Sequence, residues 1–342
     1  MKFIVRFHST LSELQFEKIR KYIDKILYKS NFLPIMGIET SYPNEIEKLD
    51  FVERIYKPRI GKFQSGEFLS TITFEPPLRK SLLSSNQLLG WGDTRVVLID
   101  SGVNGHDIVE AKDFTGTGNY DSINHGTRIA SIIKHFAKGC NLYSAKVGQS
   151  YPDELNVMMA LEWAAEKSAN IINISCGFER VNKCNGECDL CRLVSKISQL
   201  GIAVVVAAGN GGNVENSIDC PGIAEDAVTV GAIDQFYKLA EYSSCGKPGG
   251  LKPNIVTSGK GFIDGKRFEG TSFAAPVISG VLAAILYKAG NINKAIEYVY
   301  KTARDLNLPR HHQGFGCLDL ERLVEVICNE TDDSKTEGQN KS

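Results

Sequence analysis

The chain predicts an α/β fold with a parallel sheet, and two observations carry this prediction. Short apolar runs rich in β-branched residues predict buried strands that end in polar residues: "RVVLID" at Asp100, "NIINIS" at Ser175 and "IAVVVAAGN" at Asn210. The segments "TRIASIIKHF", "ELNVMMALEWAAEKSA" and "CRLVSKISQLG" have the apolar spacing of amphipathic helices. Strands that alternate with helices form parallel sheets, and ligands bind beyond the carboxyl ends of such strands. We therefore expect the functional residues at these polar strand ends.

The first 60 residues predict a separate, smaller α+β domain. "KFIVRF" and "IMGIETSY" predict strands, "TLSELQFEKIRKYIDKIL" predicts a helix, and "PNEIEKLDFVERIYKP" predicts a helix with a short strand. Thr10 and Glu13 have the spacing of a capping box, so we expect Thr10 to cap the first helix.

Three further segments follow this domain. Glycine and proline residues interrupt residues 61–86, which we interpret as a linker. Residues 87–328 contain the strands and helices of the predicted parallel sheet. Residues 329–342 are polar throughout and predict a disordered tail.

The composition favours an ordinary soluble protein whose partner is a polypeptide. The 39 basic and 40 acidic side chains give a net charge of −1, without the positive excess that attracts nucleic acids or anionic membranes. The first residues lack the apolar core of a secretory signal, about 7 to 15 residues long, and no uncharged stretch reaches the roughly 20 apolar residues that span a bilayer. We therefore expect a cytoplasmic protein that binds neither nucleic acid nor membrane.

Three residues have the types and positions that nucleophilic catalysis requires. Ser272 opens a helical pattern in "EGTSFAAPVISG", His125 begins "HGTRIASIIKHF", and Asp100 ends a predicted strand. A serine hydroxyl becomes a nucleophile when a histidine takes its proton, and a carboxylate must hold that histidine in the right tautomer. Each residue alone also has an ordinary interpretation: a helix cap for Ser272, a core or surface residue for His125, and a turn residue for Asp100.

Asn210 is a candidate donor for the oxyanion that develops in acyl chemistry. Glycines flank it in "VVAAGNGG" and leave room for a substrate backbone, although a plain Asn-Gly turn explains the same residues.

Five segments, in this order along the chain, resemble the subtilisin-like serine proteases, or subtilases. They are "VVLIDSGVN", "NHGTRIAS", "INISCG", "VVVAAGNGG" and "GTSFAAPVISG".

The resemblance covers about residues 87–328 and implies a subtilisin-like parallel sheet with helices on both faces. It implies a serine endopeptidase that hydrolyses peptide bonds through an acyl-enzyme intermediate. Ser272 would be the nucleophile, His125 the general base and then acid, and Asp100 the carboxylate that orients His125. Asn210 and the backbone N–H of Ser272 would form the oxyanion hole.

The resemblance also identifies a substrate-binding strand and an inhibitor. Ser175, Cys176 and Gly177 would pair with the main chain of an extended polypeptide substrate. Residues 1–60 resemble, more weakly, the ferredoxin-like propeptide that covers the active site of subtilases. The chain would then be a zymogen that is inhibited by its own N-terminal domain.

Two departures from the family concern metals. No Asp or Glu occurs between Gly126 and Pro152, so we expect no calcium site after His125, and catalysis is expected to need no cofactor. The segment "CNGECDLC" has a C-x₃-C-x₂-C spacing that is moderately specific for a metal, and soft thiolates favour zinc or an iron–sulfur cluster.

A structural zinc site would use Cys184, Cys188 and Cys191, with Cys176 or Cys220 as the fourth ligand by analogy with the family. Reduced, metal-free cysteines or a disulfide are the alternatives. The resulting competing function is a non-catalytic, or metal- or redox-gated, subtilase-fold binding or sensing protein. The complete set of candidate catalytic residues favours the enzyme.

Overall fold

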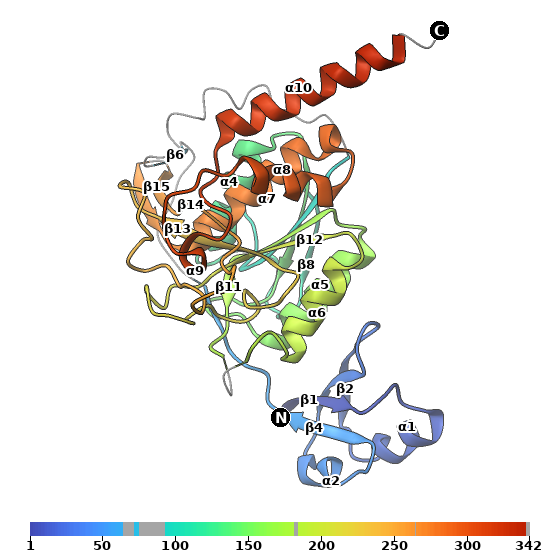
Figure 1. Ribbon diagram of the computed structural model, residues 1–342. Helices are drawn as coiled ribbons and strands as arrows, with labels where there is room; N and C mark the ends of the chain where they lie inside the picture. Colours follow the sequence, from blue (N-terminus) through green and yellow to red (C-terminus); the bar gives the residue numbers. More distant parts are fainter. Residues whose placement is uncertain (64–71, 75–92, 181–183, 264, 340–342) are drawn as a thin grey trace.

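The computed structural model describes residues 1–63, 72–74, 93–180, 184–263 and 265–339 and has a small N-terminal domain beside a large α/β domain (Figure 1). The small domain has the order β1, α1, β2, β3, α2, β4, and its antiparallel sheet has the strand order β2-β3-β1-β4. This is the predicted ferredoxin-like arrangement. The elements are β1 Lys2–Phe7, α1 Glu13–Arg20, β2 Lys25–Lys29, β3 Ile35–Glu39, α2 Pro43–Glu47 and β4 Val52–Tyr56.

The first helix is shorter than predicted and begins later. Ser12, not Thr10, is its N-cap: the Ser12 hydroxyl accepts from the backbone N–H of Gln15 at 3.3 Å, and the Gln15 side chain accepts from the Ser12 N–H at 2.9 Å. Both residue pairs have the capping-box spacing, so the spacing alone could not separate them. Residues 25–27, predicted as the end of this helix, belong instead to strand β2, because they pair with β3.

The large domain is built on a seven-stranded parallel sheet in the order β14-β13-β12-β10-β7-β9-β8. Its strands are β7 Arg95–Asp100, β8 Ile108–Asp113, β9 Asn141–Lys146, β10 Ile171–Ile174, β12 Ala203–Ala207, β13 Val228–Ile233 and β14 Ile255–Ser258. Smaller sheets join β11 Cys176–Gly177 to β5 Lys62–Phe63, and β15 Lys260–Ile263 to β16 Lys266–Glu269 and β6 Ile72–Phe74.

Helices cover both faces of this sheet, as predicted. One face packs against α4 His125–Phe136, α7 Thr271–Ala289, α8 Ile292–Thr302 and α10 Leu320–Gln339, and the other packs against α5 Glu154–Glu166 and α6 Asp189–Ser198. A short helix, α9 Arg310–Gln313, precedes α10. Side chains of β7 alternate between the two cores, with Val96 and Leu98 in one and Val97 and Ile99 in the other.

α7 is apolar and long enough to cross a membrane, but 83% of its most apolar window is buried inside the domain, which makes it a core helix.

The C-terminal residues differ from the prediction of a disordered tail that begins at residue 329, because α10 continues through Gln339. Leu320, Leu323 and Ile327 pack on the core and anchor this helix, a pattern that the tail composition does not reveal.

Candidate active site

Asp100 and His125 form a buried hydrogen-bonded pair at the carboxyl end of the inner strand β7. His125 Nδ1 lies 2.7 Å from Asp100 Oδ1, and their side chains are 0% and 1% exposed. Because a carboxylate only accepts hydrogen bonds, Nδ1 carries the ring hydrogen and Nε2 is the basic nitrogen. Gly126 permits the close approach of α4, since a Cβ there would lie 2.2 Å from the carbonyl oxygen of Gly102.

A second buried carboxylate, Asp121, organises the surroundings of this pair. Its Oδ2 accepts from the N–H and hydroxyl of Thr127 at 2.9 and 2.7 Å, and its Oδ1 accepts from the Ser101 hydroxyl at 2.8 Å. Burial raises the pKa of Asp100, whereas the hydrogen bonds from His125 and the Ser101 N–H lower it. Sequence reasoning missed Asp121; its one signal is an acidic residue four positions before the helix start.

Ser272 is the second residue of α7 and is fully buried. Gly270 is the N-cap, at φ 148°, so the interpretation of Ser272 as a cap is wrong. A Cβ on Gly270 would lie 3.0 Å from Asn210 Nδ2 and 3.3 Å from Ser272 Oγ, so the amide and the hydroxyl face the same gap. The ring of the next residue, Phe273, has its centroid 5.7 Å from that of His125. The start of α7 therefore gathers Ser272, His125 and Asn210.

Thr271 orients Asn210. Asn210 Oδ1 accepts from the Thr271 N–H at 3.0 Å and from the Thr271 hydroxyl at 2.9 Å. This fixes the amide so that Nδ2 is its donor toward the gap above Gly270. Thr271 Oγ1 also accepts from the Gly209 N–H at 3.1 Å. Sequence reasoning missed this residue, although it directly precedes Ser272.

The candidate substrate strand is paired with the chain itself. We name residues 59–63 the docked segment. Its β5 runs antiparallel to β11, with Phe63 opposite Cys176 and Lys62 opposite Gly177. On its other side Ile60 forms a β-bridge with Asp153. The docked segment therefore lies between β11 and Asp153 of the large domain and pairs through its main chain with both.

Ser175 supports Ser272 instead of lying in the β11 ladder. Its hydroxyl donates to the Ser272 carbonyl oxygen at 2.8 Å, and Asn173 Nδ2 donates to the Ser175 hydroxyl at 2.9 Å. Cys176 and Gly177 form β11 as expected of a strand that binds a peptide.

The four cysteines Cys184, Cys188, Cys191 and Cys220 converge, with their sulfur atoms within 4.8 Å of one another; we name them the cysteine cluster. Of the two candidates for the fourth position, the structure therefore selects Cys220 and not Cys176. The backbone of Cys220 pairs with Phe178 through hydrogen bonds of 2.8 and 3.0 Å, which brings a distant segment to the cluster. Hydrogen bonds from Cys188 and Cys191 and the charge of Arg59 lower the pKa of Cys220 to about 5, which favours a thiolate.

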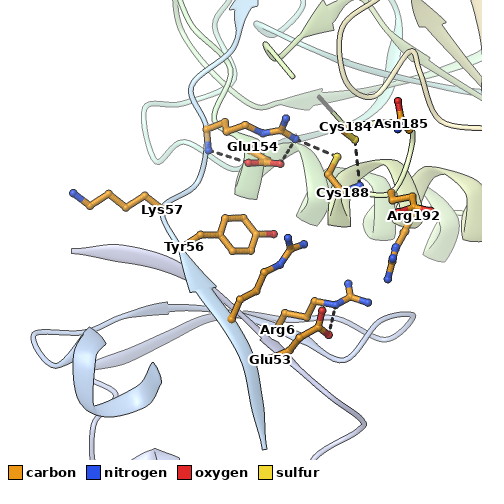
Figure 2. A pocket seen from close by; sticks show the side chains of 12 residues that line it. Arg6, Glu53, Tyr56, Lys57, Glu154, Cys184, Asn185, Cys188 and Arg192 are labelled. Carbon is orange, nitrogen blue, oxygen red and sulfur yellow. Dashed lines mark hydrogen bonds and ion pairs between the residues drawn. The ribbon is translucent and has the colours of Figure 1, made fainter. Parts of the chain in front are cut away.

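The N-terminal domain docks next to this cluster: in Figure 2, Arg6 and Glu53 line the small-domain side of a pocket whose other side is lined by Cys184 and Cys188. Asp189, the first residue of α6, has a fully buried side chain. It accepts hydrogen bonds from three side chains of the small domain: Arg6, Arg54 at 2.8 Å and Tyr56.

A second anchor lies on α5. Glu162 accepts from the Tyr28 hydroxyl at 2.5 Å, from the Ser30 hydroxyl, and from the Asn31 N–H at 3.0 Å. Burial, together with the charge of Glu162, raises the pKa of Tyr28, so this phenol stays protonated and donates. None of these docking residues had a visible signal in the sequence.

Sequence comparisons place this chain among known peptidases. The family model described as "Subtilase family" matches residues 60–316. Subtilisin DY of Bacillus licheniformis is 28% identical over 291 residues, which cover 75% of this chain and 99% of that protein. Alkaline elastase YaB of Bacillus sp. (strain YaB) is 26% identical over 288 residues, 77% of this chain and 72% of the elastase.

Solved structures share the fold. The epidermin leader peptide processing serine protease of Staphylococcus aureus, as its S393A mutant, matches with a TM-score of 0.73 at 19% identity, over 95% of this chain and 99% of that chain. The prenylagaramide maturation protease matches with a TM-score of 0.59 at 26% identity, over 74% of this chain and 98% of that chain.

Proposed function

Because the chain belongs to the subtilase family and is a serine endopeptidase, we propose that Ser272, His125 and Asp100 are its catalytic triad. The observation that carries this proposal is the buried 2.7 Å hydrogen bond between Asp100 and His125, whose ring lies 5.7 Å from that of Phe273, the residue after Ser272. A serine without such a pair is a poor nucleophile at neutral pH.

The reaction follows from this geometry. Ser272 Oγ attacks the scissile carbonyl carbon while His125 Nε2 takes the hydroxyl proton, and Asp100 stabilises the imidazolium that forms. His125 then gives the proton to the leaving amine, which departs and leaves an acyl ester on Ser272. Water attacks the ester with His125 again as base, which releases the carboxylate product and restores the serine.

Charge on the tetrahedral intermediate is stabilised at the start of α7. Asn210 Nδ2 and the Ser272 N–H are the proposed donors, and the N-terminal end of a 19-residue helix adds its positive dipole. Because Thr271 holds the amide in place, this stabilisation needs no rearrangement when charge develops.

We further propose that the N-terminal domain and the docked segment keep the enzyme inhibited. The docked segment makes the main-chain pairing with β11 that an extended substrate would make, and the anchors on Asp189 and Glu162 hold the domain beside it. A chain in this state must release the segment before a substrate can enter.

The cysteines support a cytoplasmic location as part of this proposal. All nine are free thiols, seven of them buried, which suits a reducing compartment in which disulfides do not persist.

An active-site probe tests the proposed triad. A fluorophosphonate should label the wild-type chain at Ser272, as located by mass spectrometry of the digested protein. Ser272→Ala should abolish labelling, whereas Ser195→Ala, on the opposite face of the sheet, should leave it intact. Labelling that persists in Ser272→Ala, or that is absent from the wild type after the N-terminal domain has been removed by proteolysis, would contradict the proposal.

A further inference from the structure

We propose that the cysteine cluster binds a single zinc ion that joins the substrate groove to the docking surface of the N-terminal domain. Its ligands come from separate segments, with Cys184 before α6, Cys188 and Cys191 at its start, and Cys220 far along the chain. The sulfurs of Cys188 and Cys191 are 3.3 Å apart, and those of Cys188 and Cys220 are 3.7 Å apart. Tetrahedral zinc with bonds of about 2.3 Å separates its sulfurs by about 3.8 Å, so one ion fits with small adjustments.

The same distances argue against the other occupants of such a cluster. An iron–sulfur cluster places several metal and sulfide atoms between its thiolates and spaces them farther apart than one shared ion does. A disulfide needs sulfurs about 2.05 Å apart. The cysteines here are free, and four converge where a disulfide would use two.

Hydrogen-bond donors of the kind that support metal thiolates surround the cluster. The Cys188 N–H lies 3.3 Å from Cys184 Sγ, and the Arg59 guanidinium lies 3.4 Å from Cys188 Sγ. Arg59 belongs to the docked segment and is held by an ion pair of 2.5 Å with Glu154. A positive charge of the docked segment therefore lies 3.4 Å from the sulfur of one cysteine of the cluster.

Two backbone connections extend the effect of the ion. Cys188 directly precedes Asp189, which accepts the Arg54 ion pair of the N-terminal domain. Cys220 pairs with Phe178, the residue after β11, which binds the docked segment. Loss of the ion would therefore weaken the ion pair between Asp189 and Arg54 and also the pairing of β11 with the docked segment. This coupling rests on the proposed inhibitory role of the N-terminal domain, whereas the zinc site does not.

Metal analysis tests the site. Protein purified without a metal-affinity tag or added metal should contain about one zinc per chain by plasma mass spectrometry. Cys220→Ser should lose most of it, and Cys245→Ser, a buried cysteine outside the cluster whose Sγ donates to the Val214 carbonyl oxygen, should retain it. Cobalt exchanged into the wild type should show the absorption of a tetrahedral thiolate site. Iron in place of zinc, no metal, or a disulfide in the cluster would each overturn the proposal.

Hydrogen exchange in the Ser272→Ala chain tests the coupling without any activity readout. Removal of zinc by a chelator under reducing conditions should raise exchange roughly tenfold or more in residues 184–191 and also in 52–63, but not in the remote helix α8. An increase confined to residues 184–191 would overturn the coupling. Because this chain lacks the nucleophile, neither outcome depends on whether the triad assignment is right.

From a separate observation, we infer that Asp219 selects substrates with a lysine or arginine immediately before the cleaved bond. A cavity between β11 and the oxyanion asparagine is lined by Gly177, Asn210, Gly211 and Asp219, among others. The Asp219 carboxylate lies over two glycines: a Cβ on Gly177 would be 3.2 Å, and one on Gly209 2.7 Å, from its Oδ2. A residue whose carbonyl oxygen meets Asn210 would extend its side chain into this cavity.

The side chain of Asp219 is partly buried. No hydrogen bond or ion pair among the described residues ends on its carboxylate, and burial with the charge of Glu179 raises its pKa to about 6. Arg180, Lys62 and Arg59 act more weakly in the opposite direction. A cationic side chain that enters the cavity would supply the missing partner.

Matched peptides test this inference, which deepens the proposed function. Quenched fluorescent peptides that differ only before the scissile bond should be cleaved at least about tenfold faster, by kcat/KM, with Lys or Arg than with Gln or Leu. Asp219→Asn should abolish this preference, so that the ratio of kcat/KM between the Lys or Arg peptides and the Leu peptide falls to about one. An unchanged ratio would overturn the inference, while Ser272 labelling without preference would leave the triad standing. Absence of both labelling and cleavage would overturn the proposed function itself.

Discussion

The proposed catalytic centre and the N-terminal domain that we propose inhibits it are built in different ways. Asp100, His125 and Ser272 lie at the ends of buried elements that share the core of the large domain. The proposed inhibitor is held at an interface, by one two-residue ladder, by side-chain bonds to Asp189 and Glu162, and by packing of Ile4 and Ile35 in the buried apolar cluster that contains Leu155 of α5. An interface between two domains can open without unfolding either domain, whereas core elements open only with the domain. We therefore expect the proposed triad to keep its arrangement when the N-terminal domain and the docked segment dissociate.

The largest expected effect is a loss of kcat in a variant whose N-terminal domain stays docked. His125→Ala should lower kcat by roughly 10⁶-fold, because it removes the proposed general base. The far-ultraviolet circular dichroism and the docking of the N-terminal domain should be unchanged, since the docking contacts lie on α5 and α6. A variant that keeps more than about one hundredth of the kcat would contradict the assigned base.

A smaller loss is expected at the oxyanion donor. Asn210→Ala should lower kcat by about 10²- to 10³-fold with little change in KM, because the amide acts on charge that exists only in the transition state. Thr271→Val removes the hydroxyl that orients the amide and should give a weaker loss in the same parameter. Steady-state kinetics on one peptide would measure both, and an effect on KM alone would contradict the assignment.

The next change weakens the docking of the N-terminal domain and leaves the proposed triad intact. Arg6 contacts two acids, the buried Asp189 and the half-exposed Glu53. Asp189→Asn removes the buried charge partner that Arg6 and Arg54 share and leaves Arg6 with only the half-exposed Glu53, which should cost up to about 3 kcal/mol of docking and speed fluorophosphonate labelling of Ser272 by tenfold or more. Glu53→Gln is the control and should change labelling by less than about twofold, since exposed ion pairs contribute little.

A subtler loosening is expected in the docked segment. At Gly61 a Cβ would lie 2.7 Å from the Gly177 carbonyl oxygen and 2.8 Å from side-chain atoms of Phe178 and Pro152. Gly61→Ala should therefore displace the segment and raise the labelling rate several-fold. Phe178→Ala enlarges the groove and should partly restore slow labelling in the double variant. Slower labelling in Gly61→Ala would show that the segment does not cover the site.

Sequence reasoning could single out the residues of the proposed centre because they stand at the ends of elements with clear patterns. Asp100 and Asn210 follow β-branched runs, and His125 begins an amphipathic helix. Cys220 could not be separated from Cys176, because only the backbone pairing with Phe178 decides which sulfur reaches the cluster. Asp189 showed no signal at all, because its partners belong to a domain that is more than a hundred residues away in the chain.

The smallest expected effect is on the pH dependence of stability and comes from Asp219, which lines the cavity beside β11 and Asn210. The pKa of Asp219 is raised to about 6, so between roughly pH 4 and 6 the folded chain holds a proton that the unfolded chain has lost. The free energy of unfolding must therefore fall as pH rises through this window, by at most about 1.4 kcal/mol per pH unit from this group. Asp219→Asn lacks the titration, so its stability relative to wild type should grow from pH 4 to 6, as urea unfolding at each pH would measure. A constant difference between the two proteins would show that the carboxylate is already paired, and would remove the reason to expect a cationic side chain beside it.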